Sequence, residues 1–212
     1  MLVSEIFLSI QGESTYAGRP CIFVRLSGCN LSCDWCDTRY AAAGEGAVEM
    51  TVEEVSEAVS RFKPSIVEVT GGEPLMQAEA RALVKRLLDG GGEVLVETNG
   101  SLCLEGVDER AVKIVDVKCP SSGHAGSFLV ENLKYIKESD EVKFVIGDYA
   151  DYEFAKEFSG EFIKDRTEKI LFAPVRPGLE PRLLAEWILR DGLKVRLQLQ
   201  IHRYIWDSER GR

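Results

Sequence analysis

Several features that define other protein classes are missing from this chain of 212 residues. No stretch approaches the roughly 18 consecutive apolar residues of a transmembrane helix, so we expect no association with a membrane. The segment from Met1 to Ile6 has neither the basic residues nor the continuous apolar run of a signal peptide. We therefore expect a cytoplasmic protein.

An excess of basic charge is also missing. The chain has 26 Lys and Arg residues against 35 Asp and Glu residues, and its net charge is −9. Direct binding of RNA or DNA usually requires a basic surface, because neutralised phosphates supply much of the affinity. We therefore expect no direct nucleic-acid partner. Since no repeat, low-complexity segment or linker interrupts the chain, we expect residues 1–212 to form a single domain.

Cysteine carries the strongest signal in this sequence. The chain has 6 cysteines, and clustered cysteines in a reducing compartment indicate a metal or catalytic site rather than disulfides. Cys29, Cys33 and Cys36 form a C-x3-C-x2-C run. Three thiolates so close in sequence can hold three irons of a four-iron cluster, and the fourth iron is then open to another ligand.

A zinc site is the alternative for these cysteines. Structural zinc takes four ligands, often from two C-x2-C pairs. Cys33 and Cys36 form one such pair, but the sequence has no second pair and no His-x3-His. Cys21, Cys103 and Cys119 are isolated in the sequence. A zinc or electron-transfer module without enzymatic activity therefore stays open at this point.

Strand and helix patterns alternate along the chain. Strands are expected at residues 2–10, 21–26, 65–70, 93–98, 112–117, 141–146, 169–173 and 194–201. Helices are expected at residues 52–62, 77–88, 128–137, 149–158 and 181–190, the first of them opened by a capping box at Thr51 and Glu54. This alternation predicts an α/β fold with a mostly parallel sheet. About six curved strands would form a partial (β/α)6-type barrel with an N-terminal strand extension, because the chain is short for a full eight-unit barrel.

Polar and glycine-rich segments follow several of the expected strands. They are the cysteine run and residues 70–74, 98–100 and 118–123. Since ligands bind at the carboxyl ends of parallel strands, we expect these segments to meet at one rim and to form the active face.

The cysteine run after a strand resembles the radical S-adenosylmethionine (SAM) superfamily, as do the aromatic Trp35 before its last cysteine and the later Gly71-Gly72-Glu73-Pro74. The resemblance implies a [4Fe-4S] cluster on Cys29, Cys33 and Cys36, with SAM on the open iron. One electron from the cluster then cleaves SAM, and the 5′-deoxyadenosyl radical takes a hydrogen atom from the substrate.

The same resemblance implies a set of residues that bind SAM. They are Trp35, Gly72, Glu97, Asn99, Lys118 and Ser121. Three of them have a structural alternative: Trp35 could simply pack beside the loop, Gly72 could serve a tight turn, and Asn99 could form a turn with the glycine that follows it.

A narrower resemblance, to the 7-carboxy-7-deazaguanine synthase family, covers nearly the whole chain. It rests on Ile10-Gln11-Gly12-Glu13-Ser14, Arg25, Cys36-Asp37-Thr38, Glu73-Pro74, Pro120-Ser121-Ser122-Gly123, Gln200-x-His202 and Glu209-Arg210-Gly211. Members contract the ring of 6-carboxy-5,6,7,8-tetrahydropterin with loss of ammonia, regenerate SAM and need Mg²⁺. Their product leads to queuosine and archaeosine in tRNA.

The narrower resemblance also implies the substrate site. Its residues are Ile10, Gln11, Gly12, Glu13, Arg25, Thr70 and His202. Gln11 and Glu13 suit the donor and acceptor edge of a pterin, and Arg25 suits its carboxylate. Thr38 is the expected Mg²⁺ ligand, with a helix or turn cap as its alternative. A surface salt bridge is the alternative for Arg25, and a structural role is the alternative for His202.

The partners follow from the same reading. We expect a pterin as the small-molecule substrate, a reductant such as a flavodoxin, and a homodimer, because a short barrel leaves one side open to water. The tail departs from the family pattern, since several residues follow His202. A glycyl-radical activating enzyme, which shares the cysteine loop but acts on a protein, is the remaining alternative.

Overall fold

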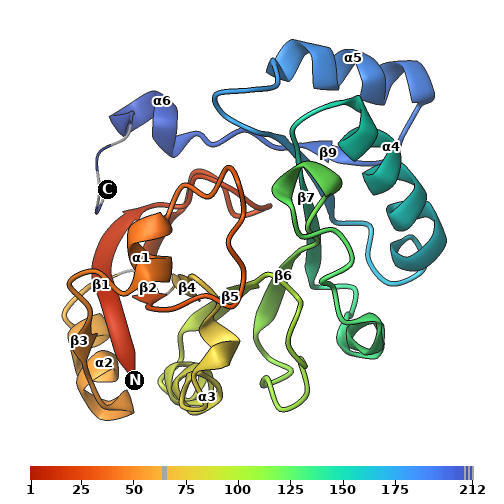
Figure 1. The fold of residues 1–212 in the computed structure, drawn as a ribbon. Helices are drawn as coiled ribbons and strands as arrows, with labels where there is room; N and C mark the ends of the chain where they lie inside the picture. The colour runs from red at the N-terminus through yellow and green to blue at the C-terminus, as the bar shows by residue number, and fades with distance from the viewer. Residues whose placement is uncertain (64–65, 208, 210, 212) are drawn as a thin grey trace.

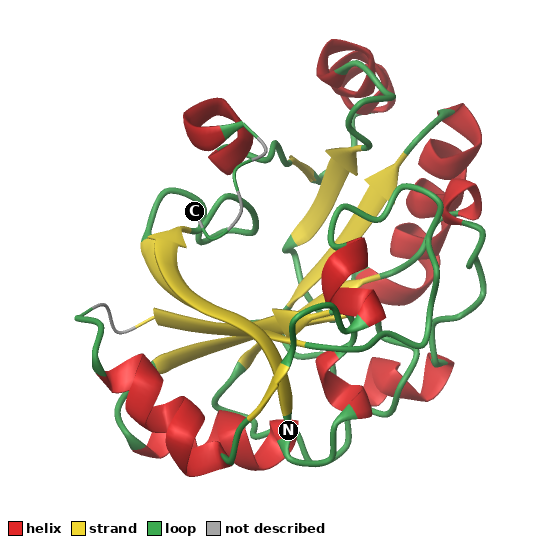
Figure 2. Cartoon of the chain, turned by 60° about the vertical axis from the view of Figure 1, so that its left-hand side comes forward, coloured by secondary structure: helices red, strands yellow, loops and turns green. Residues whose placement is uncertain are grey.

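The computed structural model describes residues 1–63, 66–207, 209 and 211. One sheet of nine strands runs through it, in the order β3-β1-β2-β4-β5-β6-β7-β8-β9. The strands are β1 (Leu2–Ile10), β2 (Pro20–Leu26), β3 (Val48–Glu49), β4 (Ile66–Gly71), β5 (Glu93–Thr98), β6 (Val112–Asp116), β7 (Glu141–Ile146), β8 (Ile170–Pro174) and β9 (Arg196–Leu197). Figure 1 colours the chain from red at the N-terminus to blue at the C-terminus, and Figure 2 shows the curvature of the sheet.

The strand directions confirm the predicted mostly parallel sheet. From β2 to β9 every neighbouring pair is parallel, whereas β1 pairs antiparallel with both β2 and β3. The parallel strands are apolar on both faces over much of their length, as strands covered on both sides must be. β1 and β3 therefore form the expected N-terminal extension, and the remaining strands form a partial barrel.

Helices lie on the outside of the curved sheet (Figure 2). The α-helices are α1 (Arg39–Ala43), α2 (Val52–Ser60), α3 (Ala80–Asp89), α4 (Tyr149–Phe158), α5 (Pro181–Asp191) and α6 (His202–Trp206). Shorter turns are η1 (Pro74–Met76), η2 (Pro120–Ser122), η3 (Val130–Tyr135) and the π-helical η4 (Ser159–Ile163). The predicted capping box of α2 is present, with Thr51 and Glu54 bonded reciprocally. None of the helices described is long and apolar enough to cross a membrane.

The two faces of the sheet are packed differently. The larger core fills the space between the sheet and the outer helices, and it includes Val55, Leu83 and Leu184. A smaller apolar cluster lies on the inner face, where Ile66, Leu95 and neighbouring residues meet. Further along the same strands, toward their carboxyl ends, the inward positions change from apolar to charged. This change creates a polar floor inside the half-barrel.

Two predicted elements differ from the structure. Residues 128–137 form only the short 3₁₀ segment η3, because the buried Asn132 amide bonds to the backbone of Gly100, Leu102 and Leu104 and so ties the segment to the preceding loop. Residues 194–201 form only the two-residue β9. The Gln198 N–H still donates to the Phe172 carbonyl of β8, while the side chains of Gln198 and Gln200 donate to Glu13.

The first predicted residue of the strand at 65–70, Ser65, lies outside the described residues, as do Arg210 of the C-terminal motif and the final Arg212.

Replacing Leu83 by Ala should lower the free energy of unfolding by about 2–5 kcal/mol, because it leaves a cavity under α3. Leu83 is fully buried, whereas Leu189 on α5 is 79% exposed. Leu189→Ala is the matched control and should change stability by no more than about 0.5 kcal/mol. Urea unfolding of both variants measures the difference, and equal losses would contradict this description of the core.

Candidate active site

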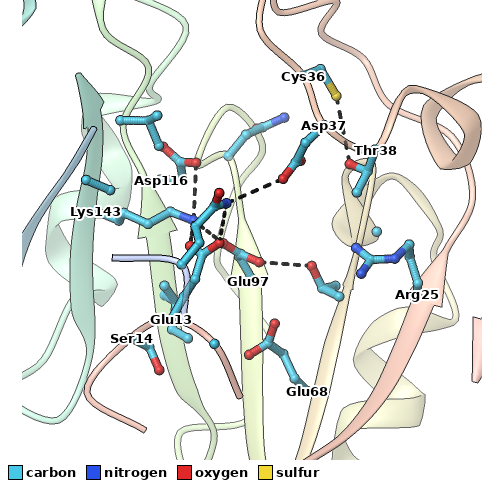
Figure 3. A pocket seen from close by; sticks show the side chains of 18 of the residues that line it. Glu13, Ser14, Arg25, Cys36, Asp37, Thr38, Glu68, Glu97, Asp116 and Lys143 are labelled. Atoms are coloured by element: carbon cyan, nitrogen blue, oxygen red, sulfur yellow. Dashed lines mark hydrogen bonds and ion pairs between the residues drawn. The ribbon is translucent and has the colours of Figure 1, made fainter. Parts of the chain in front are cut away.

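A cavity of about 240 Å³ opens at the carboxyl ends of the parallel strands. Its wall combines the N-terminal loop, the cysteine loop, the inward side chains of β2 and β4–β8, and the segment around His202 (Figure 3). The segments that were expected to meet at one rim therefore do so. All but one of the predicted site residues line this cavity, and the exception is Ser121.

The cysteine loop begins where β2 ends. Cys29, Cys33 and Cys36 are half-buried free thiols in the cavity wall. Burial raises the pKa of both Cys29 and Cys33. The loop is held by the Asp34 N–H, which donates to the Ser122 carbonyl at 3.2 Å, and by the Ser32 N–H, which donates to His124 Nε2 at 3.0 Å. The three thiols therefore reach the cavity from a loop anchored on both sides.

Gly71 and Gly72 fit the end of β4 against this loop. A Cβ on Gly71 would lie 2.1 Å from the Leu26 carbonyl oxygen, and one on Gly72 would lie 2.2 Å from the Gly28 oxygen and 2.7 Å from Cys29 Cβ. Gly71 also has φ of +148°, which side-chain-bearing residues rarely adopt. The glycines thus allow close approach of the protein's own backbone and place both residues in the cavity wall.

Glu73 ties the ends of β4 and β5 together. Its fully buried carboxylate accepts hydrogen bonds from Leu75 N, from Thr98 Oγ1 and from Asn99 N, at 2.7–2.9 Å. Asn99, held in this way, points its amide nitrogen toward Cys29 Sγ at 4.0 Å. The predicted SAM residue Asn99 therefore lies directly beside the cysteine loop.

Trp35 is oriented by polar partners on two sides. Its indole Nε1 donates to Ser121 Oγ at 3.1 Å, and the Lys118 ammonium lies 5.4 Å from its ring centroid. Ser121 in turn donates to the buried Asp151. Ser121 was predicted to bind SAM, but the structure places it behind Trp35 and outside the cavity wall. Its hydroxyl group holds the indole ring in place.

The N-terminal loop presents Gln11 and Glu13 to the cavity. Gln11 Nε2 donates to Glu68, and Gln11 Oε1 accepts from Glu13 N at 3.0 Å. The Glu13 carboxylate accepts from Gln198 and Gln200, both at 2.9 Å, and pairs with Lys143 at 3.2 Å. Gln11 is thus partly used inside the protein, whereas Glu13 is held as a fixed carboxylate at the cavity wall.

His202 packs directly on the N-terminal loop. A Cβ on Gly12 would lie 1.9 Å from His202 Nδ1, so Gly12 leaves the space that the imidazole fills. The Ile201 N–H donates to the Gly12 carbonyl at 3.0 Å. Burial lowers the pKa of His202, which favours the neutral imidazole. The ring therefore both closes the loop and faces the cavity.

Arg25 and Thr38 were each predicted with an alternative that the structure tests. Arg25 is not a surface residue: its side chain is 16% exposed, donates from Nε to Glu5 at 2.8 Å, and points into the cavity (Figure 3). Thr38 precedes α1, but its side chain makes no capping hydrogen bond. Its hydroxyl lies 3.8 Å from Cys36 Sγ and lines the cavity.

The chain is similar to known proteins along nearly its whole length. The Radical SAM superfamily model matches residues 23–121, which include the cysteine loop and the glycine pair. A 7-carboxy-7-deazaguanine synthase of Koribacter versatilis is 45% identical over 99% of this chain and 98% of its own length. A synthase of the same name from Chlorobaculum tepidum is 47% identical over 98% and 94%.

The chain belongs to the 7-carboxy-7-deazaguanine synthase family. The predicted membership is thereby confirmed, and so is the predicted fold. The crystal structure of QueE from Escherichia coli matches 94% of this chain and 93% of its own with a TM-score of 0.76, at 24% sequence identity. That similarity shows that the two proteins share the partial-barrel fold.

The residues present fit the cluster and SAM that the superfamily implies. In the part of the chain that is described, no three His, Cys, Asp or Glu side chains converge on one point as the ligands of a single metal ion would. A cubane is bound differently, because each thiolate takes its own iron. Asp116 Oδ1 is a buried acceptor in the cavity wall without a hydrogen-bond partner in the protein, as expected where a bound molecule supplies a donor.

Sequence reasoning missed three charged residues in the floor of this synthase-family site. Glu68, Asp116 and Lys143 all line the cavity from the interiors of β4, β6 and β7. A signal for them was available, because a charged residue in an apolar strand rarely lacks a role. Gln198 was missed as well, since its partner Glu13 lies at the other end of the sequence.

Glu68 differs from the other carboxylates of the site. Glu68 is almost fully buried, with 3% of its surface exposed. Burial raises the pKa of Glu68 well above its usual range, and the neighbouring carboxylates of Glu97 and Glu13 raise it further. The folded protein therefore holds the Glu68 proton to a higher pH than the unfolded chain, which loses that proton above about pH 4.3.

Replacing Glu68 by Gln should raise stability relative to the parent protein increasingly as the pH rises above about 4.3. Protonated Glu68 contributes fully to the free energy of unfolding below the pKa that Glu68 has in the unfolded chain. This contribution is lost as the pH rises toward the pKa in the folded protein. Gln does not ionise, so its contribution does not change with pH. Melting temperatures of both proteins between about pH 5 and pH 8 measure the trend.

Glu54→Gln is the control for that trend, because hydrogen bonds from Thr51 lower the pKa of the exposed Glu54. The contribution of Glu54 to stability is present at neutral pH and is lost only as the pH falls. The stability of the Glu54→Gln variant relative to the parent should therefore not rise with pH. If the melting temperatures of Glu68→Gln and the parent changed with pH in the same way, the raised pKa of Glu68 would be contradicted.

Proposed function

We propose that the chain converts 6-carboxy-5,6,7,8-tetrahydropterin to 7-carboxy-7-deazaguanine with loss of ammonia, as a radical SAM enzyme of deazapurine biosynthesis. Membership of the 7-carboxy-7-deazaguanine synthase family supports the activity. The observation that carries the finer assignment is that the Gln11–Glu13 loop and the cysteine loop line the same cavity. Substrate and cofactor would therefore meet between them.

The cofactor side of the cavity is formed by the cysteine loop and the ends of β4–β6. Cys29, Cys33 and Cys36 would hold the cluster, which supplies the electron for cleavage of SAM when both are bound. Asn99, fixed by Glu73, would hold SAM beside Cys29. Trp35 would present its ring to the cofactor in the orientation that Ser121 imposes.

The substrate side is formed by the N-terminal loop, β2 and His202. The Glu13 carboxylate would accept hydrogen bonds from the amino-pyrimidine edge of the pterin. Arg25 would bind the pterin carboxylate, since Nε is bound to Glu5 and the guanidinium extends into the cavity. Although burial by itself lowers the pKa of Arg25, Tyr40 and Glu5 raise it, so the net pKa lies above its usual value and the group stays charged.

The expected homodimer and reductant belong to the same proposal. β3 pairs with β1 at Leu2 and Val3, so most of β1 remains at the edge of the sheet. Leu8 on β1 is 42% exposed and Val48 on β3 is 61% exposed, which supports a second subunit on this edge. A small electron-transfer protein such as a flavodoxin would supply the electron.

The protein should convert the carboxypterin to the deazaguanine when it is reconstituted with iron and sulfide and supplied with reductant, Mg²⁺ and SAM. Because SAM is regenerated, 5′-deoxyadenosine should accumulate in far smaller amounts than the product. Chromatography of the reaction mixture measures both compounds. Cys33→Ala, which cannot hold the cluster, is the control. Absence of pterin turnover would overturn the proposed function, and equal amounts of 5′-deoxyadenosine and product would overturn the regeneration of SAM.

Replacing Thr38 by Ala should raise the Mg²⁺ concentration needed for half-maximal activity by about tenfold, because one hard oxygen ligand is lost. The Thr38 hydroxyl is available for this role, since it does not cap α1. Thr38→Ser keeps the oxygen and should behave as the parent protein does. Activity titrated with Mg²⁺ measures the effect, and an unchanged requirement in the Ala variant would exclude Thr38 as the ligand.

A further inference from the structure

Lys143 on β7 contacts three carboxylates inside the half-barrel. Its ammonium lies 3.2 Å from Glu13 and 3.6 Å from Asp116, and it forms an ion pair with Glu97 (Figure 3). The Lys143 side chain is 6% exposed. Glu13 comes from the N-terminal loop, Glu97 from β5 and Asp116 from β6, so one ammonium group joins three separate parts of the chain.

The charge on Lys143 is maintained by these neighbours. Burial by itself lowers the pKa of Lys143, but Glu13 and Glu97 raise it, and the result lies well above the usual value. In the described part of the chain no other lysine or arginine forms an ion pair with Glu13 or Glu97. Loss of the ammonium would therefore leave Glu13 and Glu97, whose side chains are 23% and 27% exposed, without a paired cation.

The three carboxylates belong to opposite sides of the cavity. Glu13 is on the substrate side, where Gln198 and Gln200 also hold it. Asp116 is on the cofactor side, because its other partner is Lys118 at 2.9 Å, and Lys118 lies over the Trp35 ring of the cysteine loop. Lys143 is thus the point at which the two sides are joined.

We propose that Lys143 is a positioning residue that fixes the substrate-side carboxylate Glu13 relative to the cofactor-side carboxylate Asp116, with Glu97 as its third partner. The inference rests on the proposed function. Hydrogen transfer from a bound substrate requires near-contact geometry, and a shift of about 1 Å can cost about 100-fold in rate. Without Lys143, SAM would still be cleaved, but the pterin would be held out of reach of the reacting group.

A purely structural role for Lys143 would have different consequences. Lys113 on β6 provides the comparison, because it is also a buried lysine, 4% exposed at its side chain and paired with Asp140 at 2.8 Å. Alternation along the strand places Lys113 on the face opposite to Asp116. Val115 of that face belongs to the core under the helices, whereas Ile114 belongs to the inner cluster. Substitution of Lys113 therefore shows the effect of removing a buried ammonium group that does not contact the cavity.

The test compares Lys143→Met and Lys113→Met with the parent holoenzyme. Met keeps the length of the apolar stem and removes the charge. For Lys143→Met we expect kcat/KM for the pterin to fall about 100-fold, and the ratio of released 5′-deoxyadenosine to deazaguanine to rise at least about tenfold. Calorimetric binding of the pterin without SAM should weaken as well. Lys113→Met should keep the parent ratio even if its melting temperature falls.

The outcomes separate this inference from the proposed function. If the parent enzyme forms product and Lys143→Met keeps the parent ratio, the positioning role is wrong. It is also wrong if Lys113→Met raises the ratio equally. Should Lys143→Met fail to fold, Asp116→Asn removes one of the three carboxylate charges without a loss of volume, and an unchanged ratio in that variant would overturn the inference. Absence of product from the parent enzyme would instead refute the proposed function.

Discussion

Burial of charge inside the half-barrel is the constraint on which the cavity depends. Glu13, Glu97 and Asp116 point inward from three parts of the chain, and each needs a cation or donors because it is partly or largely withdrawn from water. Lys143 supplies that cation. Glu68 meets the same constraint in another way, since it keeps its proton and accepts from Gln11. The floor of the site is therefore an arrangement of compensated charges whose members move little relative to one another.

Close backbone packing sets the rest of the site. The end of β4 passes so near the end of β2 and the cysteine loop that neither Gly71 nor Gly72 has room for a side chain. Glu73 then ties this turn to Thr98 and Asn99. The cysteine loop, the glycine pair and the asparagine consequently form one unit. A loop of this kind presents three thiols in a defined arrangement before any metal is bound, which lowers the entropy lost when a cluster assembles.

The limits of prediction are visible in particular residues. Arg25 was predicted from the family resemblance. The argument that a charged residue in an apolar strand rarely lacks a role selects Arg25 too, and it also identifies Glu68, Asp116 and Lys143. Yet it would also select Lys113, which pairs with Asp140 on the other face of the sheet. For Ser121, its place in a motif suggested contact with SAM, and only the structure shows that its hydroxyl accepts a hydrogen bond from the Trp35 indole. Residues 128–137 were predicted as a helix because the bonds of the Asn132 side chain to a distant loop cannot be read from local pattern.

The sequence by itself determined the alternation of strands and helices, the cysteine triplet and the segments that meet at the strand ends. These depend on local periodicity and on the rule that parallel strands share one rim. Only the tertiary structure decided which charges face the cavity and which partners hold them. Glu13 and Gln198 are far apart in the chain, and Lys143 contacts carboxylates from three elements. Such contacts arise from the curvature and register of the sheet, which no short segment of sequence encodes.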